Sequence, residues 1–72
     1  MATLSLGNRL KVARAERELS QEQLARLAGV TRQTISAIET GQYCPSALLA
    51  FLLAKHLSKR VDDLFFIQGE AP

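Results

Sequence analysis

Residues 19–41 read LSQEQLARLAGVTRQTISAIETG, and this stretch predicts two short helices joined by a tight turn. Ser20 has the chemistry of an N-cap, because its hydroxyl can accept a hydrogen bond from the backbone N–H of the third helical residue. Gln23 stands three residues later, where its amide can reach back to the cap, so the pair forms a capping box. We therefore expect a helix from Gln21 to Ala28.

The second helix of this stretch has its own start and stop signals. Gly29 can adopt the left-handed conformation that ends a helix without a Cβ clash. Thr31 follows two residues later and is a second N-cap type. We expect the next helix to run from Arg32 to about Thr40 and to stop at Gly41.

The two sides of this second helix differ in chemistry. At about 100° per residue, Ile35, Ile38 and the methyl group of Thr34 fall on one side, which we expect to be buried. The opposite side has no Lys or Glu and instead carries an amide, a hydroxyl, a methyl group and an arginine, which suit the edges of DNA bases. The predicted base contacts are Arg32, Gln33, Ser36 and Ala37.

The whole stretch resembles the helix-turn-helix of the lambda-repressor-like family, also called Xre-type or Cro/cI-type. The segments SQEQLA, the glycine turn, TRQTIS and IETG stand in the family's order and spacing, and the similarity extends through YCPS to DLF. The resemblance implies an all-α, compact five-helix domain with the helix-turn-helix at helices 2 and 3. It also implies a DNA-binding transcriptional regulator, similar to short stand-alone bacterial regulators.

The resemblance further implies roles for single residues. Arg14 is expected to pair with Glu39 across the core. Gln21, at the start of the first motif helix, is expected to contact a phosphate and to hold the amide of Gln33. Tyr43 can reach a phosphate or cover the start of the following helix, and the sequence does not separate these alternatives. The predicted contacts to the DNA backbone are Gln21, Thr31, Thr40, Gln42 and Tyr43.

The segments on either side of the motif are predicted from their apolar spacing. Residues 5–18 are expected to form the first helix, and a last helix near residue 61 is expected to add to the core. The start of that last helix is uncertain because Lys59 and Arg60 replace the residues usual in the family. The ordered core is expected over residues 5–67, with a polar, frayed tail beyond it. The expected core residues of these segments are Leu6, Leu10, Ala13, Val61, Leu64 and Phe65.

The segment 47–57 is predicted to be a helix that is apolar on almost every side. Leu49, Leu53 and Leu57 form the expected core stripe, whereas Leu48 and Leu52 lie on another side. Such a helix favours a homodimer interface over scattered exposed leucines. An alternative is a protein-interaction module, for example an antitoxin-like subunit that docks a partner through this helix. The predicted dimer interface is Leu48, Leu52, Phe65 and Phe66.

Composition sets the outer limits of the interpretation. A chain of 72 residues with a net charge of +2 predicts one domain over residues 1–72 and gives little electrostatic evidence of a partner. A single cysteine, Cys44, fits a reducing compartment, and no segment has the length of a membrane span, so we expect a cytoplasmic protein. The sequence predicts no enzymatic activity, cofactor, metal site or small-molecule ligand. The expected partners are double-stranded DNA and a second copy of the chain.

Overall fold

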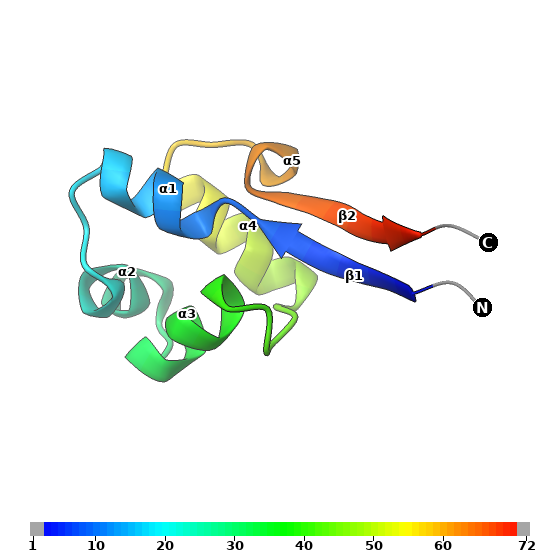
Figure 1. The fold of residues 1–72 in the computed structure, drawn as a ribbon. Coiled ribbons are helices and arrows are strands. Elements are labelled where there is room, and N and C mark those ends of the chain that lie inside the picture. Colours follow the sequence, from blue (N-terminus) through cyan, green and yellow to red (C-terminus); the bar gives the residue numbers. More distant parts are fainter. Residues whose placement is uncertain (1–2, 71–72) are drawn as a thin grey trace.

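Five helices enclose a core of Leu, Ile and Ala side chains, and a two-stranded antiparallel sheet projects from one side of them (Figure 1). A computed structural model of the chain describes residues 3–70. The elements in order are β1 (Thr3–Asn8), α1 (Leu10–Glu16), α2 (Gln21–Ala28), α3 (Arg32–Glu39), α4 (Ala47–His56), α5 (Val61–Leu64) and β2 (Phe65–Glu70).

The two motif helices begin where their caps predicted. The Ser20 hydroxyl accepts from the Gln23 N–H at 3.0 Å, and the Gln23 side-chain oxygen accepts from the Ser20 N–H at 2.8 Å. Gly29 ends α2 with a φ of +74°, a conformation that only glycine adopts without strain. The capping box and the glycine stop are therefore confirmed.

The predicted first helix over residues 5–18 is wrong in its first third. Residues 3–8 form β1, and α1 covers only Leu10–Glu16. β1 pairs with β2, so that Leu6 lies opposite Ile67 and Gly7 lies opposite Phe66. Helical spacing of Leu6 and Leu10 was a misleading signal, because the alternation in TLSLGN fits a strand whose partner lies some 60 residues away. The fold is therefore five helices with a small sheet, and not all-α.

The C-terminal tail was also predicted wrongly. Gln68 and Gly69 were expected to be frayed, but both belong to β2 and pair with Ser5 and Leu4. Ala71 and Pro72 lie outside the described residues. The ends of the chain are therefore held by each other, a long-range contact that local polarity does not reveal.

α4 lies at the centre of the core. It is the apolar helix predicted over 47–57, and the structure ends it at His56, with Leu57 as its C-cap. No helix in the described chain is long and apolar enough to cross a membrane. The buried residues are Leu10, Ala13, Leu24, Ala25, Ala28, Ile35, Ile38, Leu49, Ala50, Leu53, Ala54, Leu57, Leu64 and Phe65.

Candidate nucleic-acid interface

α3 buries one side and presents the other to solvent. Ile35 and Ile38 are 0% and 1% exposed, and they fix the helix against the core. On the opposite side Arg32 and Gln33 are exposed, whereas Ser36 and Ala37 are half-buried. The face predicted to contact bases is therefore open to a ligand, with long side chains at its start and small ones in its middle.

The end of α3 uses its own polar groups to close the helix. The Thr40 hydroxyl donates to the backbone carbonyl of Ser36 at 3.0 Å, so its proton is engaged within the protein. The backbone N–H groups of Gln42 and Tyr43 both donate to the carbonyl of Ala37, at 2.8 and 3.2 Å. Of the predicted backbone contacts, Thr40 would have to give up a hydrogen bond to donate to a phosphate.

The start of α3 is closed in the same way. The Thr31 hydroxyl accepts from the backbone N–H of Thr34 at 3.3 Å and lies 3.0 Å from the Thr34 hydroxyl. This is the predicted N-cap. The Thr31 side chain is exposed and keeps acceptor capacity, but its local role is to satisfy the helix end.

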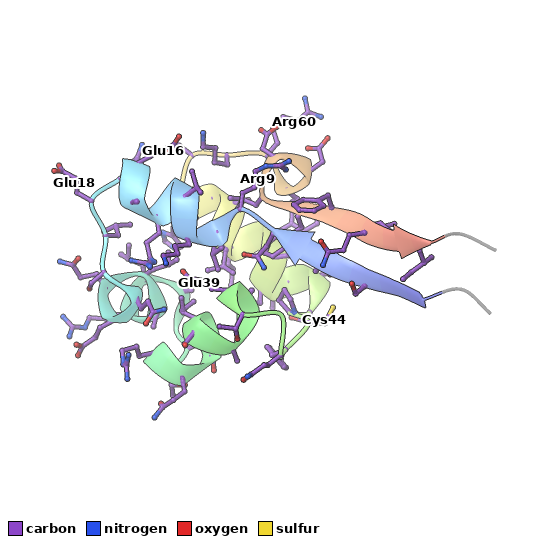
Figure 2. All side chains as sticks on the ribbon, viewed as in Figure 1. Arg9, Glu16, Glu18, Glu39, Cys44 and Arg60 are labelled. Carbon is purple, nitrogen blue, oxygen red and sulfur yellow. The ribbon has the colours of Figure 1, made fainter. Side chains whose placement is uncertain are left out.

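Arg14 and Glu39 form an ion pair between α1 and the last residue of α3. Arg14 Nε donates to Glu39 Oε2 at 2.9 Å, and Arg14 Nη2 donates to Oε1 at 3.3 Å. The side chains are only 15% and 6% exposed. A third bond runs from Arg14 Nη1 to the carbonyl of Leu19 at 2.9 Å, in the connection between α1 and α2. Glu39 thus lies among the three N-terminal helices (Figure 2).

Gln21 connects this ion pair to Arg32 of α3, through contacts that differ from the one the resemblance implied. Its amide nitrogen donates to Glu39 Oε1 at 3.0 Å, and its amide oxygen accepts from Arg32 Nη1 at 3.3 Å. The amide is therefore shared between Glu39 and Arg32, and its expected contact with Gln33 is absent among the described residues. Because the carboxylate accepts the N–H, the amide oxygen must face Arg32.

Asn8 was not singled out by the sequence interpretation, yet it joins β1 to α3. Its side-chain nitrogen donates to the carbonyl of Ile38 at 2.9 Å, and its side-chain oxygen accepts from the N–H of Leu10 at 3.1 Å. An Asn just before an apolar helical pattern is a start signal for a helix. Here Asn8 stands one position before the N-cap, Arg9, whose own side chain makes no cap hydrogen bond, and the Asn8 amide oxygen accepts from the first N–H of α1.

Tyr43 lies in the connection between α3 and α4. It is 47% exposed, and together with Cys44 it lines a groove against Leu4 and Leu6 of β1 and Ile67 of β2. The ring therefore faces the sheet, an environment that neither predicted role included. Cys44 is exposed at the same place (Figure 2).

Several basic side chains are paired with acids or lie over an aromatic ring. Lys59 lies 3.2 Å from Glu16, and Arg26 lies 3.5 Å from Glu22. Arg9 lies over the ring of Phe66, 4.5 Å from its centroid. Within α3 itself the basic residue is Arg32. The interface is therefore mostly neutral and polar.

Comparison with known sequences assigns the chain to a family. The family model described as helix-turn-helix matches residues 10–64. An uncharacterized HTH-type transcriptional regulator of Bacillus subtilis, YgzD, is 46% identical over 63 residues, which are 88% of this chain and 96% of that protein. One of Methanocaldococcus jannaschii is 48% identical over 63 residues, with the same coverage of 88% and 96%.

Solved structures agree with this assignment. The restriction-modification controller protein C.AhdI of Aeromonas hydrophila is 34% identical, covers 76% of this chain and 83% of its own, and superposes with a TM-score of 0.72. A structure described as a putative DNA-binding protein of Bacteroides fragilis is 28% identical, covers 85% and 98%, and has a TM-score of 0.78.

The chain belongs to the helix-turn-helix family of DNA-binding transcriptional regulators, of the Xre or lambda-repressor-like type. The resemblance that the motif carried is confirmed. Its relatives come from both bacteria and archaea, which is a wider range than the bacterial regulators named at first.

Proposed function

We propose that this chain is a sequence-specific regulator that reads the major groove with α3. The observation that carries the proposal is the open, lysine-free side of α3, backed by two fully buried isoleucines. A helix fixed in this way can enter the groove, which is wide enough for one α-helix. The base contacts we propose are Arg32, Gln33, Ser36 and Ala37.

Each proposed contact follows from side-chain chemistry. The guanidinium of Arg32 suits the two acceptors of guanine, and the amide of Gln33 suits the donor and acceptor of adenine. Ser36 and Ala37 are short, so the helix can approach the bases closely at its middle. Ala37 offers a methyl group to a thymine methyl.

Contacts to the DNA backbone hold the helix in register. Gln21 begins α2, and the N–H groups at that end of the helix have no partner within it, so they favour a phosphate. Gln42 and Tyr43 are exposed beyond the other end of α3. We propose that these groups and the exposed parts of Thr31 and Thr40 bracket the reading helix between two phosphates.

We further propose that the regulator binds as a homodimer to a short inverted repeat. Two copies related by a two-fold axis would read half-sites about 34 Å apart. A single α3 reads few base pairs, and the mostly neutral interface adds little electrostatic affinity, so a second copy would supply the missing affinity.

The predicted dimer residues do not all remain available. Phe65 is 6% exposed within the protomer, so it occupies its predicted core position and has little surface left for an interface. Leu48 is 71% exposed and stays a candidate, whereas Leu52 is half-buried. Phe66 is half-buried beneath Arg9. The α4 surface, defined as Leu48, Leu52 and the exposed Phe51, is one candidate interface.

The proposal is tested by selecting bound sequences from a randomised DNA pool at defined salt. We expect an enriched inverted repeat with half-sites separated by about one helical turn. Enrichment of a single half-site would retain the reading helix and reject the dimer on DNA. No enrichment over the starting pool would reject sequence-specific binding.

The role of Gln33 is tested on the selected site. Gln33→Ala should weaken cognate binding by about 1–3 kcal/mol while sparing nonspecific binding. The control is Val12→Ala, at a 59% exposed position of α1 outside both the reading helix and the two strands. An equal loss of cognate and nonspecific binding in Gln33→Ala would mean that this residue supports the fold and does not read a base.

A further inference from the structure

β1 and β2 form a two-stranded sheet, called the terminal sheet, whose outer edges have no partner in the described chain. Residues 3–8 pair with residues 65–70, and the first backbone bond beyond that ladder is from the Arg9 N–H to the carbonyl of Leu64, at 2.8 Å. In an antiparallel pair every second residue turns its N–H and C=O away from its partner. The outward-facing backbone groups of β1 can therefore bond a further strand.

The edge of β1 lacks the features that protect edge strands. Proteins usually protect such edges with lysine, proline or a bulge. The sequence of β1 is TLSLGN, which contains neither a charged residue nor a proline, and its register with β2 is continuous. The edge is therefore open to another strand.

One face of the terminal sheet is also apolar, and part of it is exposed. Leu6 lies opposite Ile67, and Leu4 points to the same face because side chains alternate along a strand. Leu4 is 52% exposed and Ile67 is 75% exposed. These three residues line a groove together with Ser5 and Gln68, and the connection between α3 and α4 lines it from the other side through Gly41, Tyr43 and Cys44.

On the opposite face of the terminal sheet, the side chains already contact one another. Gln68 donates to the Ser5 hydroxyl at 3.4 Å, and the ring of Phe66 lies between Gly7 and Arg9. The terminal sheet thus has one face whose side chains contact each other, one apolar face that is largely exposed, and an unprotected edge.

We propose that β1 pairs antiparallel with β1 of a second copy, so that the two terminal sheets form one four-stranded sheet across a two-fold axis. This inference rests on the proposed homodimer and names its interface. Two-fold pairing satisfies both open edges at once and leaves no exposed β1 edge. Because β1 carries no charge, the two strands bring no like charges into opposition.

The same pairing would set the distance between the reading helices. Asn8, at the inner end of β1, bonds the carbonyl of Ile38 in α3 at 2.9 Å. The terminal sheet lies at one end of a molecule 38 Å long, and α3 lies among the helices (Figure 1). A sheet shared by two copies therefore connects the two α3 helices through a rigid path.

Disulfide cross-linking tests the interface. In a Cys44→Ser background, Leu4→Cys, Ser5→Cys and Leu6→Cys are made one at a time, and Leu48→Cys reports on the α4 surface. Two cysteines can join only when their Cα atoms lie within about 7 Å. We expect a covalent dimer from at least one β1 variant and none from Leu48→Cys.

A charge placed on the strand tests the same interface in solution. Leu4→Lys should raise the dissociation constant of the dimer by at least about tenfold, because like charges meet across the axis. Val12→Lys, at a position 59% exposed on α1, is the matched control and should not change it. Sedimentation velocity over a concentration series measures both, and circular dichroism checks that each variant is folded.

Two outcomes overturn the inference, and a separate measurement tests the proposed function. A cross-link from Leu48→Cys alone would place the dimer on α4 and keep the proposed function. A constant monomer mass in the unsubstituted chain would reject both this interface and the homodimer in free solution. Sequence-specific binding is measured separately on a single half-site. Its failure would count against the proposed function and not against the β1 interface.

Discussion

Replacing Arg14 by alanine should strongly destabilise the fold, because it leaves the Glu39 carboxylate nearly buried and without its cation. The Glu39 side chain is 6% exposed, and its carboxylate receives two hydrogen bonds from the guanidinium, at 2.9 and 3.3 Å. Breaking a buried pair by removing one partner costs about 3–5 kcal/mol. Glu39 keeps its bond from the Gln21 amide at 3.0 Å, so we expect a loss near the lower end of that range.

The expected loss is large for a domain of this size. A chain of 72 residues has a total stability of roughly 4–11 kcal/mol. A loss of about 3 kcal/mol should lower the melting temperature by roughly 12–24 °C, since each 1 kcal/mol corresponds to about 4–8 °C in a small domain. Thermal and urea unfolding followed by circular dichroism measure the change.

Two further variants isolate the cause. Arg26→Ala breaks an exposed pair with Glu22 and should cost no more than about 0.5 kcal/mol. The double change Arg14→Met with Glu39→Leu should be more stable than Arg14→Ala, because it strands no charge. The reasoning is refuted if Arg14→Ala costs no more than Arg26→Ala. It also fails if the double variant is as unstable as the single one, since lost packing would then be the cause.

Three other substitutions test separate parts of the structure. Gly7→Ala should destabilise the fold by about 1–3 kcal/mol, because the new Cβ would overlap the ring of Phe66. Urea unfolding that matches the unsubstituted chain would contradict the register between β1 and β2. Ser46→Ala removes the N-cap that accepts from the Leu49 N–H at 3.1 Å and should cost about 1 kcal/mol in the same assay. Arg32→Ala should weaken cognate DNA binding by about 1–3 kcal/mol and relax the preference at one base pair; an unchanged selected sequence would show that it reads no base.

The helix-turn-helix could be read from the sequence because its signals are local. Ser20 with Gln23, and the left-handed stop at Gly29, act within one or two helical turns. Helix ends depend on groups close in sequence, so both starts and the end of α2 were predicted to the residue, and the end of α3 within one residue. The open and buried sides of α3 followed from the same helical spacing.

The contact between Arg14 and Glu39 came from the resemblance, not from the residues alone. The two side chains are separated by 25 positions, and nothing in either local segment pairs them. The partner of Gln21 shows the limit of such a transfer. In this chain Gln21 lies between Glu39 and Arg32, because a carboxylate and a guanidinium both reach its amide.

The sequence by itself determined the two motif helices, their caps and the chemistry of the α3 face, since each depends on residues a few positions apart. Only the tertiary structure decided that residues 3–8 and 65–70 are strands, because each needs the other to satisfy its backbone hydrogen bonds. It also decided which apolar side chains remain outside the core. Phe65 and Ile67 point to the same face of β2. Phe65 begins the strand next to the helices and is buried, whereas Ile67 lies farther out along the strand and is exposed.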